Sequence, residues 1–164
     1  MYQGQYWTEM VEIRAQQNYL VLYQLSSERW ELGIKIFLAL MSSGAIGAWA
    51  IWREYSALWA GLIALSQVIS AVYVFLPFKA RIKPLSAAAL EMGALADKAE
   101  RNWFEVSEGL LTDKQVSDAK HGLKEQKRKI INDKFGSMVI PVKKGRMNEA
   151  SLQAADYFTA HYGV

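Results

Sequence analysis

The sequence contains no cysteine, which excludes disulfide bonds, thiolate nucleophiles and cysteine-ligated metals. Histidine is nearly as scarce: only His121 and His161 occur, and neither has a second histidine or a carboxylate at a recognisable metal-ligand spacing. The glycines form no phosphate-binding loop or dinucleotide fingerprint, and no serine lies in a nucleophile elbow. We therefore expect no enzymatic activity, no cofactor and no metal site.

Charge of either sign is absent from most of the middle of the chain. The 164 residues carry a formal net charge of only +3, and the basic side chains are not gathered in a stripe with exposed aromatic residues. This pattern gives no reason to expect direct binding to nucleic acid. Charged residues are frequent toward both ends, so the chain does not spread its apolar residues as a soluble domain would.

The middle holds two long apolar runs, residues 32–52 and 57–78, separated by Arg53, Glu54, Tyr55 and Ser56. A helix of about 20 apolar residues crosses the hydrocarbon core of a bilayer, and each run is long enough. The first run follows about thirty residues that already carry charges, which favours an uncleaved anchor over a signal peptide. The sequence thus predicts an all-α membrane protein whose segment 32–78 is a two-pass transmembrane helical hairpin.

Small residues recur at four-residue spacing in both runs, a pattern that lets helix backbones approach closely in lipid. The amide of Gln67 is costly near mid-membrane unless it faces water or another helix. These features point either to packing within the hairpin or to contacts between subunits around a pore. The candidate pore or helix-packing residues are Ser43, Gly44, Gly47, Gly61, Ser66, Gln67 and Ser70.

Basic residues predict the orientation of the hairpin. Lys79, Arg81 and Lys83 directly follow the second run, whereas the connecting turn offers only Arg53 beside an acidic residue. By the positive-inside rule both termini are expected in the cytoplasm, with these three residues at the membrane surface. Lys35, about one turn inside the first run, is expected to extend its ammonium group toward the headgroups.

The flanking segments have helical patterns. Residues 1–31 are expected to form an N-terminal amphipathic helix, cytoplasmic or interfacial, and residues 79–134 a cytoplasmic helical hairpin. Within that hairpin an apolar stripe runs from Leu85 to Leu110, and Thr112 with Gln115 forms a capping-box pattern that starts a second helix.

The remaining segment, 135–164, is expected to contain an extended strap or short edge strand and then a last helix. Asn148 is the expected cap of that helix, and Gly163 its end. Its predicted apolar side consists of Leu152, Ala155, Phe158 and Tyr162. A basic run, Lys143, Lys144 and Arg146, lies between strap and helix, either as a solvated loop or in contact with anionic headgroups.

A cytoplasmic helix, a hairpin rich in alanine, glycine and serine, and a long helical region without catalytic residues together resemble the SLATT family of bacterial two-transmembrane effectors. The resemblance spans residues 6–131 and includes the helix over 85–110. It implies an antiviral-defence effector in the bacterial inner membrane that assembles as a homo-oligomer. It also implies activation by a partner, a sensor or a nucleotide-signalling enzyme.

The leading hypothesis is therefore a membrane effector that oligomerises and permeabilises the inner membrane. A phage holin is one alternative, since holins also use small-residue helices and a basic cytoplasmic end, although the long region after residue 78 exceeds that role. A non-toxic scaffold that tethers a cytoplasmic partner is the other alternative. Toxicity separates the effector from the scaffold, and a neighbouring endolysin gene would indicate the holin.

Overall fold

The computed structural model of the chain describes residues 2–51, 55–75, 78–136, 138 and 140–163, and the side chains of 44–51, 78 and 79 lie outside this description. The described residues form five helices and no strand, which confirms the predicted all-α class. The helices are α1 (Tyr2–Ile51), α2 (Ser56–Tyr73), α3 (Phe78–Ser107), α4 (Asp113–Phe135) and α5 (Lys144–Tyr162).

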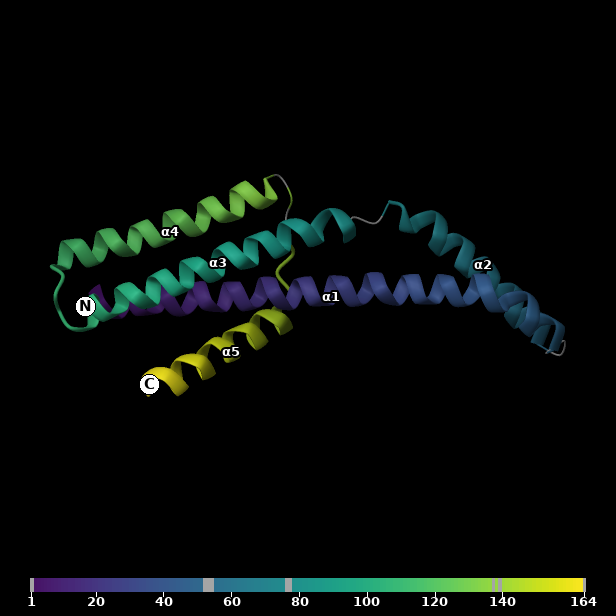
Figure 1. Cartoon of the computed structure of the whole chain (residues 1–164), viewed down its shortest axis with the longest axis horizontal. Coiled ribbons are helices and arrows are strands. Elements are labelled where there is room, and N and C mark those ends of the chain that lie inside the picture. The colour runs from purple at the N-terminus through teal and green to yellow at the C-terminus, as the bar shows by residue number, and fades with distance from the viewer. Residues whose placement is uncertain (1, 52–54, 76–77, 137, 139, 164) are drawn as a thin grey trace. The chain divides into compact units, whose positions relative to one another are not determined.

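These helices belong to two compact units. Unit 1 comprises Met1–Leu25 and Lys83–Val164, and unit 2 comprises Ser26–Ile82. Unit 1 therefore contains the first half of α1 with most of α3, and all of α4 and α5 (Figure 1). Unit 2 contains the second half of α1, all of α2 and the start of α3.

Helix α1 merges two elements that the sequence suggested were separate, the N-terminal helix and the first apolar run. It continues for 50 residues without interruption. No proline occurs before residue 77, and the glycines within α1, such as Gly33, lower helix propensity without breaking the hydrogen-bond ladder. No helix ends near residue 31, and the division predicted there lies close to the division between the units.

The second apolar run is shorter as a helix than predicted. Helix α2 ends at Tyr73 rather than Phe78, and the amide of Phe75 closes its last turn on the carbonyl of Val72 at 2.9 Å. Pro77 follows closely, as is common after a helix end. The next helix starts earlier than expected, at Phe78, and contains Pro84 in its interior.

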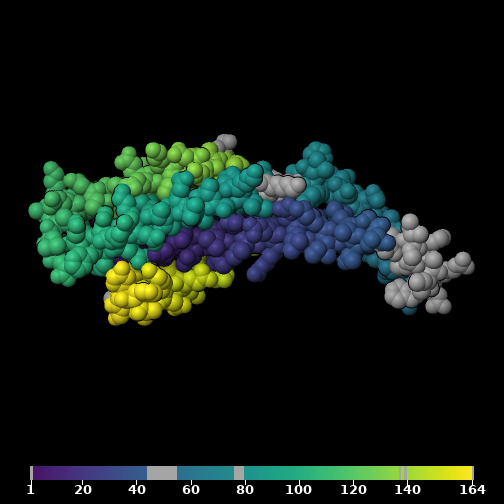
Figure 2. Space-filling model, viewed as in Figure 1, coloured from purple at the N-terminus to yellow at the C-terminus, as the bar shows by residue number. Residues whose placement is uncertain are grey.

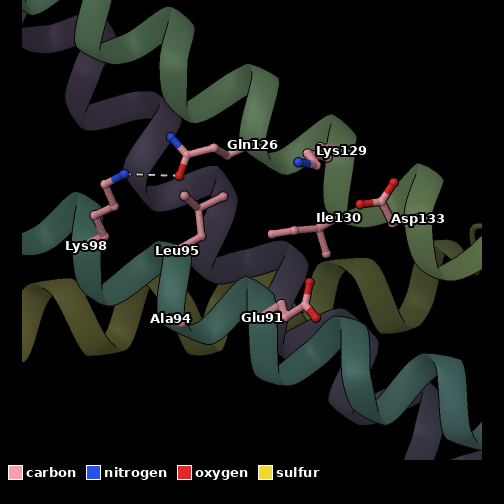
Figure 3. Close-up of a pocket in the computed structure, with 8 residues that line it drawn as sticks. All are labelled: Glu91, Ala94, Leu95, Lys98, Gln126, Lys129, Ile130 and Asp133. Atoms are coloured by element: carbon pink, nitrogen blue, oxygen red, sulfur yellow. Dashed lines mark hydrogen bonds between the residues drawn. The ribbon is translucent and has the colours of Figure 1, made fainter.

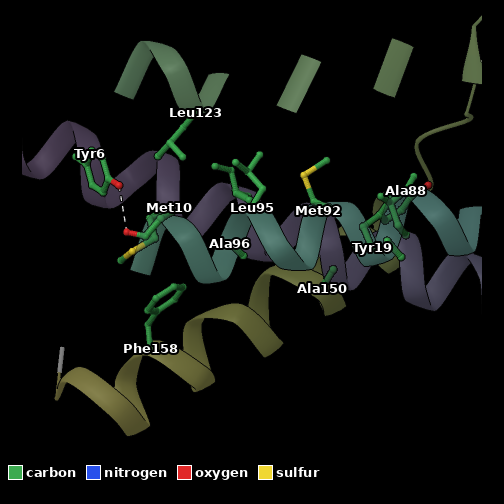
Figure 4. Close-up of a cluster of buried hydrophobic side chains, with 14 of the residues drawn as sticks. Tyr6, Met10, Tyr19, Ala88, Met92, Leu95, Ala96, Leu123, Ala150 and Phe158 are labelled. Carbon is green, nitrogen blue, oxygen red and sulfur yellow. Dashed lines mark hydrogen bonds between the residues drawn. The ribbon is translucent and has the colours of Figure 1, made fainter. Parts of the chain in front are cut away.

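Unit 1 is built around a continuous apolar core (Figure 4). The buried side chains of this cluster include Tyr6 and Met10 of α1, Met92 and Ala96 of α3, and Leu123 of α4. Figure 2 shows the first part of α1 largely covered by its neighbours in this unit. Most of the predicted stripe on α3 is buried, but Leu110 lies beyond the end of α3 and is exposed.

Helix α4 begins as predicted. The Thr112 side chain accepts a hydrogen bond from the amide of Gln115, and the Gln115 side chain accepts one from the amide of Thr112, so the capping box is confirmed. Lys98 of α3 contacts Gln126 of α4, and Glu91 pairs with Lys134. Residues later in α4 contact residues earlier in α3, which confirms the predicted antiparallel pair.

The described residues between α4 and α5 form neither helix nor strand. The Tyr19 hydroxyl donates to the carbonyl of Pro141 at 2.7 Å and accepts from the amide of Lys143 at 3.2 Å. One side chain of α1 thus holds both the strap and the residue that precedes α5. Ser137 and Val139 of the predicted strap lie outside the described part of the chain.

Helix α5 starts at Lys144, four residues before the predicted cap Asn148, and ends at the left-handed Gly163 as expected. Its buried face is Ala150, Ala154 and Phe158, whereas Leu152 of the predicted face is exposed. The difference between the predicted and the observed buried face of α5 has a steric reason. Small alanine side chains let α5 lie close to α1, where the Asn18 amide donates to the carbonyl of Ala150 at 3.4 Å.

Candidate functional site: a polar groove in the α1–α2 hairpin

Burial in unit 2 runs opposite to burial in unit 1. Among its described residues the buried ones are Glu31 and Ser66, both polar, whereas the buried set of unit 1 is almost entirely apolar. Arg29, Lys35 and Gln67 are exposed in unit 2. Most of its other exposed large side chains are apolar or aromatic: Trp30, Leu32, Ile36, Leu40, Tyr55, Leu58, Ile63, Leu65, Val68, Val72, Val74 and Phe75. Water disfavours such a surface, but the hydrocarbon of a bilayer does not.

Helix α2 is the one described helix that is long and apolar enough to cross a membrane. A buried core helix of a soluble protein can have the same composition. That explanation does not fit α2 within this chain, because only Ser66 of its 18 residues is buried. In the first run, the side chains from 44 onward lie outside the described residues, and the described part exposes Leu32, Ile36 and Leu40.

The two helices of unit 2 enclose a groove of about 550 Å³. Helix α1 contributes Leu38, Ala39, Met41 and Ser42, and α2 contributes Ile63, Ser66, Gln67 and Ser70. Four of these eight side chains are polar. The groove lies near the middle of α2 and of the first apolar run, at a depth where hydrocarbon would surround a membrane hairpin.

Two of the three serine hydroxyls that line the groove donate to backbone carbonyls of their own helices. Ser42 Oγ donates to the carbonyl of Ala39 at 2.9 Å, and Ser66 Oγ donates to that of Ile63 at 2.8 Å. Their remaining lone pairs can accept hydrogen bonds. Gln67 is exposed, and its amide has no hydrogen-bond partner in the described structure. The groove therefore presents spare acceptors beside one unsatisfied amide.

A second polar contact joins the helices of unit 2 away from the groove. The buried Glu31 carboxylate pairs with Lys35 at 2.7 Å and accepts a long hydrogen bond from the Tyr73 hydroxyl at 3.4 Å. Lys35 therefore reaches one turn toward the N-terminus, which is the direction predicted for contact with headgroups. Its partner Glu31 gave no signal in the sequence beyond the four-residue spacing of the two charges.

The structure brings together three of the predicted pore or packing residues, Ser66, Gln67 and Ser70. Ser43 is exposed and donates to the carbonyl of Ala39 at 2.9 Å. Gly61 is exposed, and a Cβ added there would meet nothing within 4 Å, so it makes no close helix contact in a single chain. The packing of Gly44 and Gly47 lies outside the described residues.

The predicted membrane-surface residues occupy the start of α3. Arg81 is half-buried and Lys83 is exposed, whereas the side chain of Lys79 lies outside the described residues. Their contact with headgroups stays a prediction.

Unit 1 has its own polar contacts, and the sequence did not single them out. The guanidinium of Arg14 pairs with Glu100 and Asp97 and lies 4.8 Å from the ring centroid of Tyr157. Burial acts to lower the pKa of Arg14, but the hydrogen bond and charge of Glu100 outweigh it and raise that pKa. The Tyr157 hydroxyl also donates to Glu100 at 2.9 Å, which ties α1, α3 and α5 together.

A groove of about 320 Å³ between α3 and α4 is lined by charged and apolar residues and by Gln126 (Figure 3). Lys98 and Gln126 bridge one end at 3.1 Å, and Glu91 faces Lys129 and Asp133 across the other. Because acidic and basic side chains both line it, this groove is best explained as a solvated contact region between two helices. Within the described residues no group of three His, Asp or Glu side chains lies close enough together to hold a metal ion.

Comparisons with known proteins add no relative, since the chain matches no protein-family model, no curated protein and no solved structure. Function must therefore be argued from the groove and its surroundings.

Proposed function

We propose that this protein is a two-pass membrane effector, with both termini in the cytoplasm, that oligomerises and permeabilises the bacterial inner membrane. The observation that supports the proposal best is the reversed burial of the hairpin. Apolar side chains cover its outside, and polar groups line a groove near half-height. A simple anchor needs the first feature but not the second.

In this proposal the first apolar run crosses the membrane within α1 and α2 crosses back. At about 1.5 Å per residue, the 18 residues of α2 extend roughly 27 Å, close to the thickness of the hydrocarbon core. Unit 1 lies in the cytoplasm, where a sensor or a nucleotide-signalling enzyme triggers the hairpin. The resemblance to SLATT effectors supplies this last step and the role in abortive infection.

Induced expression in bacteria tests permeabilisation. A potential-sensitive dye should report loss of membrane potential, and propidium should enter the cells. The Gln67→Leu and Gly47→Leu variants should reduce both signals, while Val68→Leu, a change on an apolar exposed position of α2, should not. Cells that keep their potential with the full chain in the membrane and its activating partner present would refute the effector.

A second candidate function is a non-toxic scaffold, and the surface of unit 1 favours it. Leu90, Phe104, Leu110 and Leu152 are each largely exposed although they belong to a well-packed helical unit. Exposed apolar side chains of this size occur at protein–protein contacts. Affinity purification would then recover a stoichiometric soluble partner, and expression would leave the membrane sealed.

A further inference from the structure

We infer that the α1–α2 groove binds the same groove of a second copy of this chain, with the two Gln67 amides paired with each other and with the facing serine hydroxyls. The inference rests on the membrane placement in the proposed function and adds the contact through which copies assemble.

The side-chain amide of Gln67 has unused hydrogen-bonding groups. A glutamine amide carries two donor hydrogens and an acceptor oxygen, and in the described structure none of the three is used at Gln67. Ser42 and Ser66 have already given their hydroxyl protons to backbone carbonyls. The oxygens of these two serines can then only accept further hydrogen bonds, and Gln67 can supply donors to them, but within one chain it does not.

The depth of the groove in the membrane makes an unpaired amide unfavourable. Ser42 and Gln67 lie near the middle of their apolar runs. In a membrane this depth is the hydrocarbon core, which neither water nor lipid headgroups reach. Lipid tails can fill the groove but cannot bond the amide. An unpaired amide in hydrocarbon is costly, so a partner that satisfies it is favoured.

The identity of the partner follows from the sequence of the two runs. Gln67 is the sole Asn or Gln residue in 32–52 and 57–78, and an amide is self-complementary because it both donates and accepts. A two-fold axis beside Gln67 places each amide against the other copy's amide and serines, so every contact occurs twice. A second copy thus brings the required groups in the required number and at the same depth.

The absence of cysteine from the chain gives a clean test, because any disulfide must involve an introduced thiol. Full-length Ser70→Cys, with its thiol in the groove, should form a disulfide-linked dimer in native membranes under mild oxidation. The matched control is Val68→Cys, which is exposed and points to the opposite side of α2 at about 100° per residue. It should give at most about a tenth of that dimer.

Adding Gln67→Leu to Ser70→Cys should reduce dimer formation by about tenfold, the scale of interhelical hydrogen bonds in membranes. Adding Gln67→Asn keeps an amide and should retain most of it. Resistance to alkaline extraction shows in each case that the variant is inserted. Equal crosslinking in the Leu and Asn backgrounds would overturn the inference, as would crosslinking through Val68→Cys but not Ser70→Cys, or capture of a different protein by the Ser70→Cys thiol.

Membrane potential measured in the same cells separates the two proposals. Amide-dependent dimers in cells that keep their potential with the activating partner present would support this contact and reject the effector. Loss of potential without Ser70→Cys dimers would support the effector and reject this contact, leaving the groove to water or lipid.

Discussion

At the scale of single residues, Glu9 is a charged side chain that lies in the interior of unit 1. Only 3% of the residue is exposed, and its carboxylate pairs with Lys127 at 2.6 Å and with Lys124 at 3.4 Å. Removing one partner of a buried pair leaves the other charge uncompensated. Because Lys124 is half-exposed, water screens part of that cost.

We expect Glu9→Gln to lower the free energy of unfolding of unit 1 by about 1–3 kcal/mol, less than for a fully buried pair. Glu12→Gln is the matched control, because Glu12 also contacts Lys127, at 3.4 Å, but is half-exposed. It should change stability by less than about 0.5 kcal/mol. Urea unfolding in mild detergent, followed by circular dichroism, measures both, and equal effects would show that burial of Glu9 does not matter.

Tyr6 gives a pH dependence. Burial raises the pKa of the Tyr6 phenol to about 12, against a smaller opposing effect of a hydrogen bond with Asn102. The unfolded state then loses its proton near pH 10 while the folded state keeps it. Stability from this group is therefore fully present below about pH 10 and is lost as the pH rises toward 12.

Between pH 10 and 12 the wild-type protein should lose on the order of 2 kcal/mol more stability than Tyr6→Phe, which has no phenol to ionise at this position. The variant also lacks the hydrogen bond to the carbonyl of Ala99. It should therefore start about 1 kcal/mol less stable near pH 8. Unfolding curves at several pH values measure the difference, and parallel pH profiles for the two proteins would contradict the prediction.

Sequence reasoning found Gln67 because an amide in an apolar run is conspicuous whatever it contacts. It missed Glu9 and Arg14 because their partners, Lys127 and Glu100, lie far away in the sequence. Each of the four looks like an ordinary charge on an amphipathic helix. Pairing that depends on which helix faces which is visible only once the helices are packed.

At the scale of elements, helix existence was predictable and helix boundaries were less so. The capping box at Thr112 and the glycine at 163 were read correctly because local hydrogen bonds and backbone conformation determine them. The continuity of α1 and the passage of α3 through Pro84 were missed. A change from amphipathic to apolar residues alters the surroundings of a helix without breaking its backbone. Helix α3 continues through Pro84, its seventh residue, although proline removes a backbone hydrogen bond there.

Two glycines on neighbouring helices should respond in opposite ways to larger side chains. Gly122 of α4 has nothing within 4 Å of an added Cβ, so Gly122→Ala should stabilise the protein by about 0.5–1 kcal/mol through helix propensity. At Gly93 of α3 an added Cβ would lie 2.7 Å from Gln17 Nε2 of α1. Gly93→Leu should therefore destabilise by about 1–3 kcal/mol through overpacking.

Thermal unfolding of the two variants measures this contrast. Gly122→Leu is the size control for Gly93→Leu, because the same side chain enters open space. Its stability should be at or above that of the wild type. If Gly93→Leu matched it, the α1–α3 contact at Gly93 would be looser than the structure shows.

At the scale of the whole molecule, one chain follows two rules of burial. Unit 1 hides apolar side chains such as Met10 and Met92 and exposes charge, as water requires. The described part of unit 2 exposes Leu40 and Val68 and hides Glu31 and Ser66. Composition along the sequence indicated this division. Which polar groups would meet in a groove depended on the relative rotation of α1 and α2, which periodicity alone does not determine.

The topology of the proposed hairpin is testable with single cysteines. Three basic residues follow the second run and the connecting turn has Arg53 beside Glu54, so the positive-inside rule leaves the turn outside and unit 1 in the cytoplasm. Ser56→Cys, exposed at the start of α2, should then react with a membrane-impermeant maleimide on spheroplasts. Ser151→Cys, exposed on α5, should react only after lysis.

The Gln67→Leu background avoids leakage of reagent through a permeabilised membrane, and the cysteine-free chain serves as the blank. Labelling of Ser151→Cys alone in intact spheroplasts would reverse the orientation. If both positions were labelled from the same side, the chain between them would not cross the membrane, or would enter it only as a re-entrant loop. Because charge flanking the runs sets orientation, replacing Lys79, Arg81 and Lys83 by glutamine should increase labelling of Ser151→Cys from outside, while insertion itself, driven by the apolar runs, persists.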